Sequence, residues 1–354
     1  MVTVKLHGMA YSTCTKRVWT TAKEIGVDVE IVPVDLAKGA HKDPAFIENY
    51  HPFGIIPVLE DEDGTKVYES RAIARYLVAK YAPNSPLLPS PSDPKAYVDM
   101  RVIQLYSHIW TRRNTSPWFS RLFTTLSSLK LLVFAIGNMV TVKLYGATYS
   151  TCTMRVWATA QEICVNLELL PIDLAKGEHQ NPEYVESYHP FAVIPVLVDE
   201  DGTKIFESRA ICRYLVAKYR NGSSLLPEPS NVKAYGLFEQ AASIEYSAFD
   251  PHAAALVYER IVAPMRKEEP NNELIKKCIN TLTTKMDGYE RILCKQKYLA
   301  GDTFTLADLF HLPYGQITSV IEPQILNSKP HVKAWWDNIS SRDSWKATLK
   351  FSGH

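Results

Sequence analysis

The sequence predicts a small α/β domain that occurs twice, with an all-helical domain after the second occurrence only. Three observations predict this organisation. The segment that begins at Met139 repeats the segment that begins at Met1. Each copy alternates between strand and helix periodicity. After the second copy, apolar residues continue at helical spacing almost to the end of the chain.

The repeat defines the expected domain boundaries. It aligns residue n of the first copy with residue n + 138 of the second, without a gap from Met1 to Tyr81, and it fades after the shared string KAY. A repeat of this length indicates a duplicated domain and not a solenoid. We expect a first α/β domain (1–82), a partial helical segment or linker (83–138), a second α/β domain (139–221) and a helical domain (222–354).

The first half of each copy predicts a βαβ unit. In the second copy, apolar and polar residues alternate over 140–144 like a strand, and helical spacing follows over 155–163. A second strand is expected over 167–173. Because Pro171 has no N–H to donate to a ladder, this strand belongs at a sheet edge, as does its counterpart with Pro33.

The second half of each copy predicts ββα. A stretch poor in helix signals leads to a strand over 196–198, and the turn residues Asp201-Gly202 connect it to a returning strand over 204–206. Ser208 then caps a helix that runs to about Tyr219. The four strands form one mixed sheet.

The region from Val232 onward is helical. Thr305 and Asp308 form a capping box, and Pro330 suits the first position of a helix over 331–339. A long amphipathic helix is indicated by residues spaced three or four apart: Leu274, Cys278, Leu282, Met286, Tyr289 and Leu293.

Composition excludes several function classes. The chain has 39 Lys and Arg residues against 38 Asp and Glu, so no general attraction to nucleic acid is expected. Its six cysteines form no CxxC pair, which predicts reduced thiols and no metal site. The N-terminus reads as a strand and not as a signal peptide, and we expect a cytoplasmic protein.

Three features predict a site at one end of each sheet. The string YSTCT places Ser150 and Cys152 where a strand meets a helix, and a helix N-terminus favours a thiolate. The bond between Ile194 and Pro195 precedes a strand, and a cis form would turn backbone groups outward for an extended peptide. Glu207-Ser208 starts a helix that could hold a carboxylate. Taken singly, each feature is more typical of an N-cap or a turn.

Together these features suggest a short, anionic, extended thiol ligand, and a family resemblance supplies a name for it. The strings YSTCTxRV, HPFxxIPVL, FESRAIxRYLVAKY and LAGDTFTLADLFHLP resemble the cytosolic glutathione S-transferases, most closely their phi class. The resemblance covers residues 139–354 and again 1 to about 97. It implies a thioredoxin-like sheet domain, glutathione as co-substrate, and dimers in which the sheet domain of one subunit meets the helical domain of the other.

The resemblance also implies roles for individual residues. Ser150 is the catalytic hydroxyl that stabilises the glutathione thiolate, with Ser12 as its counterpart in the first copy. Tyr149 or Cys152 are alternatives. The glutathione-binding residues implied are His179, Gln180, Val193, Ile194, Pro195, Glu207 and Ser208, and in the first copy His41, Lys42, Ile55, Ile56, Glu69 and Ser70. The electrophile pocket implied by position consists of Ala147, Thr148, Tyr149, Phe249, Pro251 and His252.

Departures from the family pattern keep two other functions open. Gln180 replaces the usual Lys, and Val193 replaces the usual Gln, which favours a non-catalytic ligand-binding module. Cys152 favours thiol-disulfide exchange or peroxide reduction with glutathione. Residues 98–138 are basic with an apolar stripe over 122–136, for which packing on protein is preferred to a membrane surface. The expected assembly is a homodimer, or an internal pseudo-dimer in which the first copy docks on the second.

Overall fold

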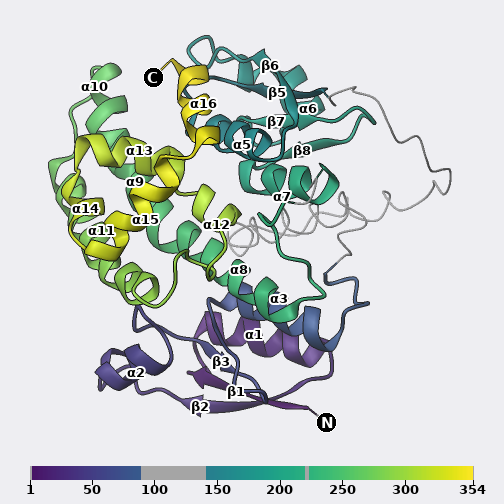
Figure 1. The fold of residues 1–354 in the computed structure, drawn as a ribbon, viewed down its shortest axis with the longest axis vertical. Helices are drawn as coiled ribbons and strands as arrows, with labels where there is room; N and C mark the ends of the chain where they lie inside the picture. Colours follow the sequence, from purple (N-terminus) through teal and green to yellow (C-terminus); the bar gives the residue numbers. More distant parts are fainter. Residues whose placement is uncertain (1, 89–140, 220–222, 354) are drawn as a thin grey trace.

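The computed structural model describes residues 2–88, 141–219 and 223–353, which form two sheet domains and one helical domain (Figure 1). In Figure 1 the first sheet domain lies at the bottom and the second at the top, with the helical domain in contact with both. The apolar stripe expected over 122–136 lies outside the described residues. No helix among the described residues is long and apolar enough to cross a membrane.

The two sheet domains have the same elements in the same order. The first contains β1 (Thr3–Gly8), α1 (Thr13–Glu24), β2 (Asp28–Pro33), η1 (Ala40–Lys42), α2 (Pro44–Asn49), β3 (Val58–Glu60), β4 (Lys66–Tyr68) and α3 (Ser70–Tyr81). The second contains β5 (Thr141–Gly146), α5 (Thr151–Glu162), β6 (Asn166–Pro171), η3 (Glu178–Gln180), α6 (Pro182–Ser187), β7 (Val196–Val198), β8 (Lys204–Phe206) and α7 (Ser208–Tyr219).

Each sheet is mixed and four-stranded, as predicted. In the second domain the strand order is β6-β5-β7-β8, with β5 and β6 parallel and the other pairs antiparallel. Strand β6 lies at the edge, which confirms the expectation drawn from Pro171. The short helix α6 was missed by the sequence analysis, although Pro182 at its first position is a typical start signal.

A buried aspartate fastens the hairpin of each sheet to the helix that follows it. Asp199 accepts hydrogen bonds from the hydroxyls of Tyr214 and Tyr219, and from Lys218 Nζ at 2.7 Å. Burial alone raises the pKa of a carboxyl, but these donors outweigh it and lower the pKa of Asp199. Asp61 repeats the arrangement in the first copy. The hairpin is therefore held as an ion-paired unit in both copies.

The helical domain begins with a nearly continuous run of helix and ends with short helices around a buried capping box. Its elements are α8 (Val232–Ile244), the π-helical turn η4 (Glu245–Phe249), α9 (Asp250–Val257), the π-helical turn η5 (Tyr258–Val262), α10 (Ala263–Met265), α11 (Asn272–Leu293), α12 (Leu306–Leu309), α13 (Leu312–Ile321), α14 (Gln324–Asn327), α15 (Pro330–Ser340) and α16 (Asp343–Ser352). The predicted capping box of Thr305 and Asp308 is present at the start of α12.

The two copies meet the helical domain through different faces. The second copy packs its helix α5 against α12, α13 and α16. The first copy instead packs α3 and β4 against α8. Gly236 of α8 lies so close to Tyr76 of α3 that a Cβ at Gly236 would lie 2.7 Å from the tyrosine ring. Both sheet domains therefore pack against the same helical domain.

Phe53 plugs the first copy into the helical domain. A Cβ at Gly288 of α11 would lie 2.2 Å from the Phe53 ring, and Tyr289 meets that ring edge-on at 5.9 Å between centroids. The carbonyl of Pro52 accepts a hydrogen bond from Arg291 at 2.6 Å. The glycine in α11 thus provides the recess that the phenylalanine fills.

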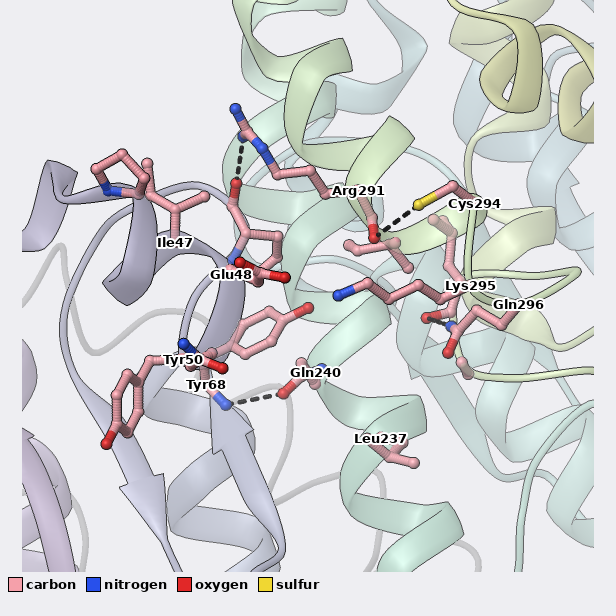
Figure 2. A pocket seen from close by; sticks show the side chains of 16 residues that line it. Ile47, Glu48, Tyr50, Tyr68, Leu237, Gln240, Arg291, Cys294, Lys295 and Gln296 are labelled. Carbon is pink, nitrogen blue, oxygen red and sulfur yellow. Dashed lines mark hydrogen bonds between the residues drawn. The ribbon is translucent and has the colours of Figure 1, made fainter.

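Further polar contacts join the first copy to the helical domain, and a cavity lies beside Pro52. The backbone N–H of Tyr68 donates to Gln240 Oε1 at 2.8 Å, and Arg75 pairs with Glu239 at 2.7 Å. A cavity of about 570 Å³ lies between α2 of the first copy and helices α8 and α11. Figure 2 shows its lining, which includes Glu48 and Lys295. The first copy is therefore docked by the Phe53 ring and by ion pairs, in addition to the packing of α3 and β4 on α8.

Candidate functional site

The sheet register brings the three sequence features of the second copy to one edge. Strand β5 ends at Gly146, and Tyr145 pairs with Val196, so Ile194 and Pro195 lie just beyond that end. Val196 also pairs with Phe206, after which Glu207 begins the next turn. The loop before α5, the Ile194-Pro195 segment and the start of α7 are therefore neighbours.

Ser150 is the N-cap of α5. Its Oγ accepts a hydrogen bond from the backbone N–H of Thr153 at 3.4 Å. The hydroxyl of Thr153 in turn accepts from the N–H of Ala147 at 3.3 Å, which fixes the loop. A Cβ at Gly146 would lie 2.6 Å from Thr153 Oγ1, so glycine is required there. Because a hydroxyl accepts and donates independently, this capping bond leaves the proton of Ser150 available for a ligand.

The peptide bond between Ile194 and Pro195 is cis, and so is the bond between Ile56 and Pro57. The sequence alone favoured an ordinary turn, so this feature is a correction in both copies. Val193 has 44% of its surface exposed, and its carbonyl accepts from the hydroxyl of Tyr184 at 3.0 Å.

Glu207 and Ser208 lie at a strained junction before α7. Glu207 has a φ of 69°, a conformation that non-glycine residues rarely adopt outside functional sites. Ser208 is 4% exposed, and its hydroxyl accepts from Arg155 Nη1 at 2.9 Å. Ser208 was expected to cap the helix, but it is instead the first helical residue, and Glu207 occupies the cap position. The buried arginine holds the two helix starts, α5 and α7, against each other.

Arg155 and its acidic partners were missed by the sequence analysis. Arg155 is fully buried and lies 3.3 Å from Asp250 and 3.8 Å from Glu245. Arg209 binds Glu245 through two hydrogen bonds of 2.7 Å and reaches Asp250 at 2.5 Å. Burial opposes ionisation, but Arg209 and Arg155 hold the pKa of Asp250 below its ordinary value. The helical domain thus supplies the counter-charges of the second copy's site.

Two further residues lie near the first turn of α5. The guanidinium of Arg155 donates to Cys152 Sγ at 3.6 Å, so this half-buried thiol contacts a fixed positive charge. Burial is the main cause that raises the pKa of Tyr314 on α13, a tyrosine that also lies close to Cys152. The sequence analysis did not single out Tyr314, because nothing local distinguishes it from a core tyrosine.

His179 and Gln180 lie in η3, the turn that follows β6. The ring atom Nδ1 of His179 is buried and has no hydrogen-bond partner, and the same is true of His41. An unsatisfied buried nitrogen in both copies is consistent with a ligand group at this place. Gln180 is exposed. The neighbouring His189, to which the sequence analysis gave no role, accepts from the N–H of Phe191 at 3.3 Å and braces that turn.

The residues expected to form the electrophile pocket are only partly brought together. Ala147 is buried, Thr148 is half-buried, and Tyr149 is 59% exposed on the loop before α5. Phe249, in contrast, is 1% exposed and packs against His311 in the core. Pro251 is exposed. The pKa of His252 is lowered by burial and by Lys285 and Lys277, which places His252 on the α11 side of α9.

The first copy repeats the backbone of the site with different surroundings. Ser12 accepts from the N–H of Thr15 at 3.3 Å, and Ser70 accepts from Arg17 at 2.6 Å. Lys42 donates to the carbonyl of Phe53 at 3.1 Å and so braces the docking loop. Burial raises the pKa of Glu69 to about 7, which Lys285 of the helical domain and Arg71 oppose. Ile55 and Ile56 are half-buried beside this site. Among the described residues, no group of three or more His, Cys, Asp or Glu could hold a metal ion.

Comparison with known families identifies all three parts of the chain. The model described as the glutathione S-transferase N-terminal domain matches residues 140–217, and a second such model matches residues 11–80. The model of the glutathione S-transferase C-terminal domain matches residues 253–343. Sheet domains and helical domain thus belong to one kind of protein.

Individual relatives agree. The Arabidopsis thaliana protein glutathione S-transferase PM239X14 is 69% identical over 198 residues, 56% of this chain and 91% of that protein. Glutathione S-transferase 3 of Zea mays is 37% identical over 60% of this chain and 94% of its own length. The crystal structure of glutathione transferase F7 from Populus trichocarpa superposes with a TM-score of 0.57 at 38% identity, covering 60% of this chain and 99% of that one. The chain therefore belongs to the glutathione S-transferase family, and it is an enzyme of the phi-class type whose N-terminal sheet domain occurs twice.

Proposed function

We propose that the second copy is the catalytic unit and that it joins the glutathione thiolate to small hydrophobic electrophiles, with Ser150 as the catalytic residue. Glutathione would lie along the sheet edge, with its cysteinyl part beside Ile194. His179 and Gln180 would bind its glycine end, and Glu207 and Ser208 its γ-glutamyl end. The maize transferase I structure, 29% identical over 60% of this chain and 98% of its own with a TM-score of 0.56, is a complex with an atrazine glutathione conjugate, which supports a co-substrate of this class.

The observation that carries the proposal is the hydrogen bonding of Ser150. Because the N–H of Thr153 donates to its oxygen, the hydroxyl proton is free to donate to a sulfur anion. The N-terminus of α5 adds favourable potential at the same place. Lowering a thiol pKa near 8.5 by about one to two units requires roughly 1.4 kcal/mol per unit, which such interactions supply.

The pKa of enzyme-bound glutathione tests this role. In wild-type protein, the ultraviolet absorbance of the thiolate should titrate about one to two units below the free thiol, and Ser150→Ala should return it towards the free value. Ser12→Ala is the matched control and should leave the titration of the second copy unchanged. A thiolate pKa that Ser150→Ala does not move would assign the role to Tyr149 or Cys152.

One observation favours a second candidate, thiol-disulfide exchange through Cys152. Its sulfur contacts the buried guanidinium of Arg155, and positive surroundings favour a thiolate. In this reaction the Cys152 thiolate attacks a glutathione disulfide, forms a mixed disulfide and releases glutathione thiolate. Reduction of hydroxyethyl disulfide that survives Ser150→Ala and disappears in Cys152→Ser would establish it.

We further propose that the first copy serves as a docked partner and not as a second catalytic domain. Its plug at Phe53 and its α3 face occupy the helical domain as the sheet domain of a second subunit would, which makes the chain an internal pseudo-dimer. We also propose that the first copy binds glutathione through Ser12, Glu69 and Ser70. A cytoplasmic location stays a prediction. Native mass spectrometry tests the assembly, since a monomer supports it and an obligate dimer contradicts it.

A further inference from the structure

Four arginines converge where the two copies meet the helical domain. Arg71 and Arg75 come from α3, and their equivalents Arg209 and Arg213 come from α7. With Tyr246 and small residues of α8 they line a partly open space of about 30 Å³. The duplicated sheet therefore brings two identical pairs of guanidinium groups to one place.

The acids that face these arginines come from a single helical domain and are shared. Glu239, fully buried, lies 2.7 Å from Arg75 and 3.5 Å from Arg213. Glu245 is bound by Arg209. Asp250 forms an ion pair with Arg209 and a second ion pair with Arg155. Three acids of the helical domain, one of them shared with Arg155, are therefore distributed among these arginines.

The positive charge of Arg71 has the weakest contacts with acidic groups among the four arginines. Among the described residues it makes no ion pair within 4 Å, its Cζ lies 5.8 Å from the centre of the Tyr246 ring, and its buried Nη2 has no hydrogen-bond partner. Glu69 acts on it only at a distance, and burial raises the pKa of that acid to about 7. Arg75 is 7% exposed and keeps a buried Nε without a hydrogen-bond partner.

Such an arrangement is costly without a counter-charge. A guanidinium does not lose its proton in a protein, and a buried charge that is not balanced costs several kcal/mol. Buried N–H groups without partners most often mark an unseen water or ion. Burial, and after it the charges of Arg17 and Arg75, lower the pKa of Arg71, while Tyr246 and Glu69 oppose this shift.

We propose that this cavity binds one small monovalent inorganic anion of the size of chloride, between Arg71 and Arg75 of the first copy and Arg209 of the second. The anion takes the place of the carboxylates that a second helical domain would supply. The space exceeds the roughly 10–15 Å³ that one water requires and is too small for an organic acid. By bridging both copies, the anion ties the first copy to the helical domain, independently of any catalytic role.

The thermal midpoint of the full chain tests this site when chloride replaces gluconate at constant ionic strength. We expect a saturable rise of about 2–4 °C in wild-type protein, because an ion that binds only the folded state stabilises it. Arg71→Met should remove the chloride effect, and the exposed control Arg266→Met should keep it. No chloride-specific shift in wild-type protein, or a full shift in Arg71→Met, overturns the proposal.

Crystals of the wild-type protein grown in bromide test the same site without any substitution, so the result does not depend on whether a variant folds. An anomalous peak between Arg71 and Arg75 supports the site. Peaks confined to surface positions, with water at this place, mean an adventitious ion only and contradict it.

Discussion

The two sheet domains contain the same motifs, yet they are placed in different electrostatic surroundings by one helical domain. In the second copy, Asp250 and Glu245 balance Arg155 and Arg209 at the edge where Ser150 lies. In the first copy, burial raises the pKa of the equivalent Glu69 to about 7, and the nearby Lys285 of the helical domain opposes this rise. The comparison teaches that the repeated motif sets the backbone of a site, whereas the helical domain sets its charge.

The largest expected effect contrasts the two equivalent arginines of the motif, Arg155 and Arg17. Arg155→Met leaves Asp250 and Glu245 without a full partner, so we expect a loss of about 3–5 kcal/mol in the free energy of unfolding. Arg17, its counterpart in the first copy, is only half-buried, so Arg17→Met should cost less than half as much. Urea denaturation of both variants at pH 7 measures this. Equal losses would mean that the helical domain does not distinguish the copies.

The plug residues provide the next contrast. Phe53→Ala removes the ring that fills the recess at Gly288 and should cost about 2 kcal/mol. Phe191→Ala, the equivalent change at a side chain that is 49% exposed, should cost well under half of that. Limited proteolysis should show the first copy released only in Phe53→Ala. Release in Phe191→Ala alone would contradict the docking.

Glutathione capture should differ between the copies as well. Glu207→Gln should weaken glutathione binding about tenfold, equivalent to about 1.4 kcal/mol, with little change in the KM of the electrophile. Glu69→Gln should change overall binding much less, because its carboxyl is already partly protonated near pH 7. Calorimetric titration distinguishes the two. If Glu207→Gln weakens the binding of glutathione and of the electrophile equally, the residue acts through folding.

The smallest expected effect is one in which the copies behave alike. Burial lowers the pKa of His51 to about 3 and that of His189 to about 4, against about 6.5 in the unfolded chain. The unfolded state therefore binds protons first, and stability is lost as the pH falls from about 6.5 towards 4. Each histidine should contribute on the order of 1 kcal/mol of this loss by pH 5. The difference between the urea midpoints at pH 7 and pH 5 should be smaller in His51→Asn and in His189→Asn than in wild-type protein. An unchanged difference would contradict a neutral buried ring.

Local sequence patterns predicted the strands of the sheet well. They missed residues whose roles depend on partners far along the chain. The strands over 196–198 and 204–206 follow from β-branched runs around Asp201-Gly202, and their bounds match the structure. The role of Arg155 was not predictable in this way, because its partner Asp250 lies 95 residues further along the chain. Phe249 was assigned to the electrophile pocket by position, and only the packing of His311 shows that its ring belongs to the core.

Steady-state conjugation by full-length Ser12→Ala and Ser150→Ala tests most directly the central claim that one helical domain makes only the second copy catalytic. We predict that Ser150→Ala lowers kcat by about one to two orders of magnitude, while Ser12→Ala stays within about twofold of wild type. Equal losses in the two variants would show that both copies catalyse, and would contradict the assignment of catalysis to the second copy.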